Sequence, residues 1–119
     1  MAPLDIDVST TDTHTVVTVV GELDLDSQEN FADLVVPAAE ASSHLVLDLT
    51  GVGFIDSSGL GALARVKKVM MRRDLPAHVV PSPRVRSALR LTGLTEAFVV
   101  HDSIEEAVSS VASTSSETS

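Results

Sequence analysis

The most constraining feature of the sequence is a strand-like segment that leads into a helix-like one. The apolar run over 45–49 is typical of a buried strand, and residues from 57 or 58 to 72 repeat apolar side chains at helical spacing. The connection carries Asp56-Ser57-Ser58-Gly59. A serine at the start of a helix can act as a nucleophile, a phosphate acceptor or a helix cap. The function of the chain depends on which of these roles applies.

Strand-like and helix-like segments alternate along the rest of the chain. The patterns predict strands at 4–8, 15–20, 44–49, 77–80 and 97–100, and helices that begin near 26–27, at 57 or 58, after 81–83 and at 102–103. The first two strands are expected to form an antiparallel hairpin, and the later alternation favours parallel pairing. We therefore predict an α/β fold with a mixed, mostly parallel sheet of about five strands and about four helices.

Several residues predict where these elements begin, bend or end. Asp26 or Ser27 is the expected N-cap of the first helix, Pro37 should kink or shorten that helix, and Gly93 should end the third one. The predicted domain covers 1–111. The remaining segment, 112–119, is rich in Ser and Thr, and we expect it to be a disordered tail.

Composition narrows the classes of function. The 119 residues suit one domain, and the absence of cysteine excludes disulfides and cysteine-based metal sites. A formal net charge of −9, with three Phe and no Trp or Tyr, argues against binding nucleic acid or an anionic membrane. The chain has no apolar run long enough to span a bilayer and no secretory signal pattern, so we expect a cytoplasmic protein without a metal or cofactor.

Two enzymatic or nucleotide-binding interpretations of the serines have weak support. A serine hydrolase needs a base, and the sequence places no histidine beside Ser57; a Gly-x-Ser-x-Gly elbow is also absent. A phosphate-binding loop needs a lysine before the helix, whereas Lys67 and Lys68 come late. Gly59 and Gly61 are better explained by close packing of the helix against the sheet.

A phosphoacceptor and a simple helix cap remain as alternatives. Phosphorylation would add about −1.5 to −2 charges at the helix start. The loops 21–26 and 54–59 should converge at one edge of the sheet, so Asp24, Asp26 and Asp56 would make the modified surface strongly acidic and repel a partner. A serine cap would instead contribute about 1 kcal/mol to stability. Local chemistry alone does not separate these two readings.

Three segments, in this order, resemble a known family. They are Gly21-Glu22-Leu23-Asp24, the strand 45–49 followed by Phe54-Ile55-Asp56-Ser57-Ser58-Gly59-Leu60-Gly61, and the stretch from Pro81 to Leu94 with its Leu-x-Gly-Leu ending. Together they resemble a STAS domain, and more narrowly an anti-sigma factor antagonist of the bacterial partner-switching type. The resemblance covers about 4–111.

The resemblance implies a regulatory protein without catalytic activity of its own. The unphosphorylated form would bind an anti-sigma factor that is also a serine kinase, and would thereby free the sigma factor for transcription. Phosphorylation would release the antagonist, and a PP2C-type phosphatase would restore it. The alternative is a STAS scaffold, or a subunit of a stress-sensing or lipid-transport complex, without a phospho-switch. Nothing in the pattern demands more than a monomer or a weak dimer.

The resemblance also assigns residues. The acceptor in the family directly follows the aspartate, which makes Ser57 the expected phosphorylation site and Ser58 the secondary candidate. The outward side of the helix 57–72 would belong to the docking face. The expected environment of the site consists of Asp24, Asp26, Asp56, Ser58, Gly59, Leu60, Ala62 and Arg65.

Overall fold

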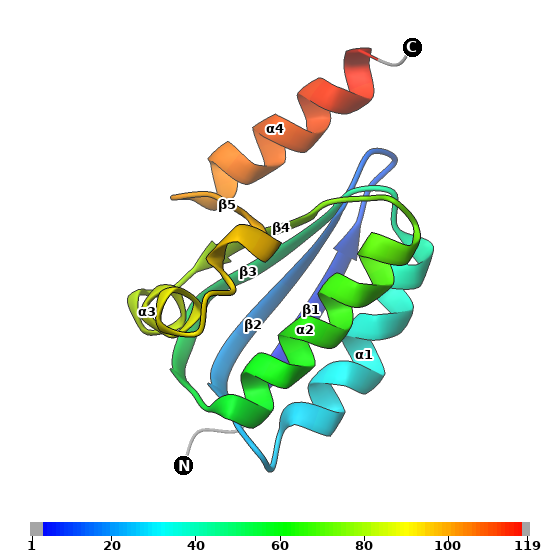
Figure 1. The fold of residues 1–119 in the computed structure, drawn as a ribbon. Coiled ribbons are helices and arrows are strands. Elements are labelled where there is room, and N and C mark those ends of the chain that lie inside the picture. Colours follow the sequence, from blue (N-terminus) through cyan, green and yellow to red (C-terminus); the bar gives the residue numbers. More distant parts are fainter. Residues whose placement is uncertain (1–3, 118–119) are drawn as a thin grey trace.

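The computed structural model describes residues 4–117, without the side chains of 113–117. Its elements are β1 (Asp5–Thr10), β2 (Thr15–Leu23), α1 (Gln28–Ala41), β3 (Leu45–Ile55), α2 (Ser57–Arg72), β4 (Ala77–Pro81), α3 (Pro83–Leu91), the short 3₁₀ helix η1 (Thr95–Ala97), β5 (Val99–Val100) and α4 (Ile104–Glu117) (Figure 1). This order confirms the predicted succession of an initial hairpin and alternating helices and strands.

The strands form one mixed sheet in the order β1-β2-β3-β4-β5. The β1–β2 pair is antiparallel and the other three pairs are parallel, which confirms the predicted α/β class. Each parallel crossover moves one strand in the same direction, so right-handed connections place α1, α2 and α3 on one face of the sheet. The carboxyl ends of β2 and β3 therefore meet beside the start of α2 (Figure 1).

Alternation along the strands divides the apolar side chains between two cores. Val17, Val19, Leu45 and Leu47 face the helices α1–α3 and contribute to the large core. Val46 and Val80 point to the opposite face, where they pack with residues of α4 in a small second cluster. The remaining buried members of these cores include Leu23, Phe31, Val35, Leu49, Leu63, Val66, Met70, Val85, Leu89, Ala107 and Val111.

Two strands are longer than the sequence predicts. β2 continues past the predicted 15–20 to Leu23, and β3 continues past the predicted 44–49 to Ile55. Gly51 favours a turn, but here it pairs with Val20 of β2, in a ladder whose register shifts between Thr18 and Val20 and again between Gly21 and Glu22. A Cβ at Gly51 would lie 2.8 Å from Val20 Cγ2, so the glycine permits this close pairing.

Of the two effects expected of Pro37, a kink or a shortened first helix, the shortening is wrong. α1 runs for 14 residues and includes Pro37, which is exposed. Proline removes the hydrogen bond to the carbonyl of Asp33, one turn earlier. Because Asp33 is also on the exposed side, water can reach that carbonyl, and the buried stripe of the helix continues past the proline.

The C-terminal elements also differ from the expectation. The predicted strand 97–100 is divided into η1 and a two-residue β5. α4 extends to Glu117, because no Gly or Pro follows Val111 to end the helix. The expected disordered tail, 112–119, thus falls largely on helical residues, and 118–119 lie outside the described residues.

Candidate functional site

The first turn of α2 is capped by Asp56, not by a serine. The backbone of Asp56 is extended, and its Oδ1 accepts a hydrogen bond from the backbone N–H of Gly59 at 3.0 Å. The Asp56 carbonyl accepts from the N–H of Leu60 at 2.9 Å. The cap interpretation of Ser57 and Ser58 is therefore wrong, because the residue before the first helical one is the residue whose side chain can reach the free N–H groups.

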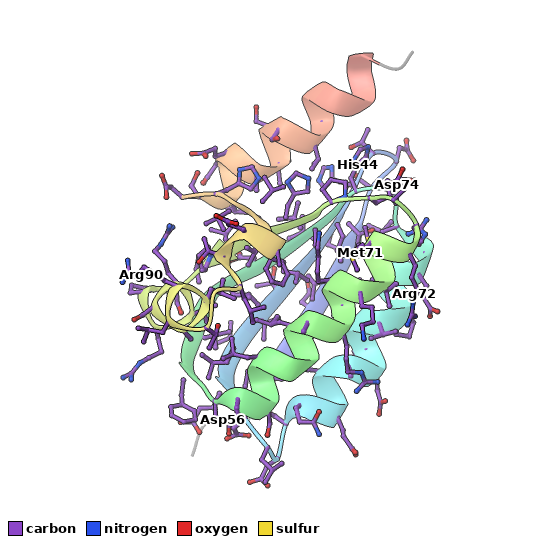
Figure 2. The ribbon with its side chains drawn as sticks, viewed as in Figure 1. His44, Asp56, Met71, Arg72, Asp74 and Arg90 are labelled. Carbon is purple, nitrogen blue, oxygen red and sulfur yellow. The ribbon has the colours of Figure 1, made fainter. Side chains whose placement is uncertain are left out.

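The same aspartate joins two loops that are distant in sequence. Its Oδ2 accepts a hydrogen bond from the N–H of Leu25 at 3.3 Å, and its own N–H donates to the carbonyl of Leu23 at 3.3 Å. These bonds tie the loop after β2 to the loop after β3. The predicted convergence of 21–26 and 54–59 is thus confirmed (Figure 2, at the Asp56 label).

The loop after β2 is held by its own side chains. Asp24 Oδ1 accepts hydrogen bonds from the N–H groups of Asp26 and Ser27, each at 3.1 Å. Ser27 occupies the N-cap position of α1, as predicted, but makes no side-chain cap bond. Its hydroxyl donates instead to the carbonyl of Glu22 at 2.7 Å. Asp24 and Ser27 therefore fix the shape of the loop beside α2.

Ser57 is the first residue of α2, and its side chain is exposed. Ser58 follows and is half-buried. Among the groups that the structure describes, neither hydroxyl has a hydrogen-bond partner, because Asp56 already occupies the cap position. An exposed, uncommitted hydroxyl at a helix N-terminus is accessible to a modifying enzyme, and the helix dipole tolerates negative charge there.

Gly59 permits the close approach of α2 to the sheet. A Cβ at this position would lie 2.3 Å from the carbonyl oxygen of Leu23 and 2.9 Å from Ile55 Cγ1. The packing role predicted for Gly59 is confirmed. The same role for Gly61 is wrong, since a Cβ there would meet nothing within 4 Å. Gly61 lies on the outward side of the helix, which the sequence pattern alone does not distinguish from a tightly packed position.

The other expected site residues occupy different depths. Leu60 is half-buried and packs against the main core, whereas Ala62 is 1% exposed and belongs to that core. Arg65 and Asp26 are exposed, and Asp24 is half-buried. The outward side of α2 therefore begins at Ser57 and includes Arg65, while the side chain of Ala62 faces the sheet.

Two exposed apolar side chains lie beside Ser57, and the sequence pattern does not predict their exposure. Leu25 is 69% exposed and Phe54 is 41% exposed. Leu25 stands two positions after the buried Leu23, and Phe54 stands two positions after the buried Val52, so strand alternation does not separate them from the core. Their exposure adds apolar surface beside Asp56, a combination that suits protein contacts.

The charges at the site are acidic and unpaired. The ion pairs among the described side chains are Arg86–Asp102 at 3.1 Å and His101–Glu106 at 3.6 Å, and both lie elsewhere. The described residues contain no group of three or more His, Cys, Asp or Glu arranged to hold a metal ion. None of the described helices combines the length and apolar character needed to cross a bilayer.

Comparison with known proteins identifies the family. The model of the STAS domain matches residues 5–107. The chain belongs to the STAS domain family. This STAS domain is 29% identical over 104 residues to an anti-sigma-B factor antagonist of Staphylococcus epidermidis, an alignment that covers 86% of this chain and 96% of the relative.

Solved structures agree with this assignment. An anti-sigma factor antagonist from Mycobacterium paratuberculosis superposes with a TM-score of 0.72 and 28% identity, covering 91% of this chain and 93% of that one. A putative anti-sigma factor antagonist from Thermotoga maritima gives a TM-score of 0.77 and 25% identity, with 89% and 93% covered. The resemblance inferred from the motifs is thus confirmed.

Proposed function

We propose that this STAS domain is a cytoplasmic, non-enzymatic anti-sigma factor antagonist with Ser57 as its phosphorylation site. The anti-sigma factor antagonists among its relatives support the role. The observation that carries the assignment to Ser57 is the capping of α2 by Asp56, which leaves the adjacent exposed hydroxyl without a structural task. Ser58 is half-buried and stays the secondary candidate.

The unphosphorylated surface suits a protein partner. Leu25 and Phe54 offer exposed apolar area, and the tied loops hold them close to the start of α2. The proposed partner is an anti-sigma factor with serine kinase activity. Binding to the antagonist would compete with binding to the sigma factor and so free the sigma factor for transcription.

Phosphorylation would change the surface by charge, without refolding. A phosphate on Ser57 adds about −1.5 to −2 charges beside the acidic side chains of Asp24, Asp26 and Asp56. One added charge about 7 Å from a partner carboxylate costs about 2 kcal/mol at an effective dielectric constant of about 20. Two such contacts would weaken binding by about three orders of magnitude. A PP2C-type phosphatase would then return the protein to its binding form.

The test measures phosphate transfer and binding with the cognate anti-sigma factor. Incubation with this kinase and ATP should place phosphate on the Ser57 peptide, detected by mass spectrometry, and Ser57→Ala should abolish it. Ser57→Asp should bind the anti-sigma factor at least tenfold more weakly than wild type in calorimetry.

Ser58→Ala is the matched control, because it removes the neighbouring hydroxyl and should leave both phosphorylation and binding intact. Phosphate that persists in Ser57→Ala would refute the assignment of the acceptor. Full binding by wild type together with no phosphorylation of either serine would favour the alternative, a STAS scaffold without a phospho-switch.

A further inference from the structure

The basic residues of this acidic protein are concentrated on one helix. The chain has eight Lys and Arg residues against 17 Asp and Glu. Five of the eight belong to α2 or directly follow it: Arg65, Lys67, Lys68, Arg72 and Arg73. The chain has a net charge of −9, yet the region of α2 carries most of its positive charge. This helix is therefore locally basic within an acidic protein.

Three of these cations share a face of α2 with the acceptor serine. At 100° per residue, Ser57, Arg65, Lys68 and Arg72 fall within about 80° of one another around the helix axis. All four are exposed. Arg65, Lys68 and Arg72 are called the basic stripe below. In Figure 2 the labels of Asp56 and Arg72 mark the two ends of this face.

The basic stripe has no intramolecular task among the described residues. None of its side chains forms an ion pair there, although Glu40 of α1 lines the same surface hollow. Arg73 differs, because its guanidinium donates hydrogen bonds to the carbonyls of Ala39 and Ser42 at the end of α1. Arg73 therefore joins α1 to α2, whereas the stripe is free for an external anion.

The stretch of α2 between the serine and the stripe is nearly bare. Gly61 lies between them on the same face, and the space around its Cα is open. A partner chain can approach the helix backbone closely at this point. The acceptor serine and the basic stripe are thus parts of one continuous surface.

We propose that the basic stripe binds an acidic segment of the same protein partner that covers Ser57. This inference rests on the proposed function, since the partner is the anti-sigma factor. A protein segment fits better than a bilayer or a nucleic acid, because Glu29, Asp33 and Glu40 are exposed on the neighbouring helix α1. Of these carboxylates, Glu40 shares the hollow that the stripe lines, so a narrow acidic segment meets that one, whereas a broad polyanionic surface would meet all three.

The face would then carry opposite charges at its two ends. The acidic side chains around Asp56 lie at the N-terminal end of α2, and the stripe lies in its second half. With a rise of about 1.5 Å per residue, the stripe begins about 12 Å and ends about 22 Å from Ser57. These separations exceed the Debye length of about 8 Å at physiological ionic strength. The effects of Ser57 modification and of stripe charge on the dissociation constant should therefore multiply.

The test is charge reversal with a matched control. Arg65→Glu/Lys68→Glu lowers the net charge by four and should weaken binding to the cognate anti-sigma factor by about tenfold to a hundredfold, with a smaller salt dependence. Arg84→Glu/Arg90→Glu makes the same change in net charge on exposed, unpaired positions of α3 and should stay within about threefold of wild type. Arg72 is left in place, because a cation in the last turn favours the helix.

Each outcome decides between explanations. Equal binding of wild type and the Arg65/Lys68 variant, or equal weakening by both double variants, would overturn the role of the stripe while leaving the proposed function intact. Failure of wild type to bind the anti-sigma factor would refute the proposed function and this inference together. Stripe-dependent binding to phosphatidylserine vesicles, without any effect on the anti-sigma factor, would assign the stripe to a membrane instead. Arg65→Gln/Lys68→Gln repeats the test should the reversed variant fail to fold.

Discussion

The fold contains a buried histidine pair that should make its stability sensitive to acid. His78 in β4 and His101 after β5 lie side by side, with 2.9 Å between Nδ1 and Nε2 and ring centroids 5.2 Å apart. Each residue is 7% exposed. Burial, followed by the electrostatic influence of His101 and then of His44, lowers the pKa of His78 from 6.5 to about 4. Glu106 of α4 faces the other side of His101.

The sign of the effect follows from proton linkage. The pKa of His78 is lower in the folded state than in the unfolded state, so the unfolded chain binds more protons between pH 6.5 and about 4. The stability contributed by neutral His78 is present above pH 6.5 and is lost as the pH falls toward 4. The free energy of unfolding should decrease by about 2 kcal/mol between pH 7 and pH 5, and by about 3 kcal/mol at pH 4.

The assay compares wild type with His78→Gln by urea unfolding at pH 7 and pH 5. Glutamine cannot titrate, so the variant should lose about 2 kcal/mol less than wild type over this interval, and the two proteins should have equal m-values. The variant is expected to be the less stable protein at pH 7 because the pairing with His101 is altered. An acid loss in His78→Gln as large as that of wild type would refute the reasoning.

Two further predictions concern the start of α2. Gly59→Ala should destabilise the fold by about 3 kcal/mol, because its Cβ would meet the backbone carbonyl of Leu23, whereas Gly61→Ala should stabilise it by about 0.5–1 kcal/mol. Thermal unfolding of the two variants measures both changes. A small destabilisation by Gly59→Ala would contradict the close packing of Gly59 against Leu23. Asp56→Ala should lower the free energy of unfolding by about 1–2 kcal/mol and increase amide hydrogen exchange at Leu25. Asp56→Asn keeps the capping oxygen and should lower the free energy of unfolding by less than half as much. Equal losses of stability in the two variants would show that the cap bond does not account for the effect.

Much of the fold follows from patterns that depend only on neighbouring residues. The helical spacing through Arg72 predicts α2, and the apolar run from Leu45 predicts the buried part of β3. The extension of β3 to Ile55 could not be predicted in this way. It depends on pairing with the end of β2, a contact between segments about 30 residues apart, and such contacts override local turn preference.

The candidate site was partly predictable for the same reason. The sequence motif predicts Ser57 as the acceptor and brings Asp24 and Asp56 into one region. It does not reveal which side chain caps α2, because Asp, Ser and Thr all suit that position and only the backbone geometry decides. The different surroundings of Gly59 and Gly61 likewise depend on which side of α2 faces the sheet.

The double attachment of Asp56 has a consequence for the kinetics of modification. Fixing the backbone of a flexible loop costs about 1–2 kcal/mol per residue in conformational entropy. Here the loop after β2 and the start of α2 are already immobilised against each other by one carboxylate. Under the proposed function, a kinase that binds Ser57 would therefore have no flexible segment to order, and its encounter with the serine would resemble the docking of two rigid bodies.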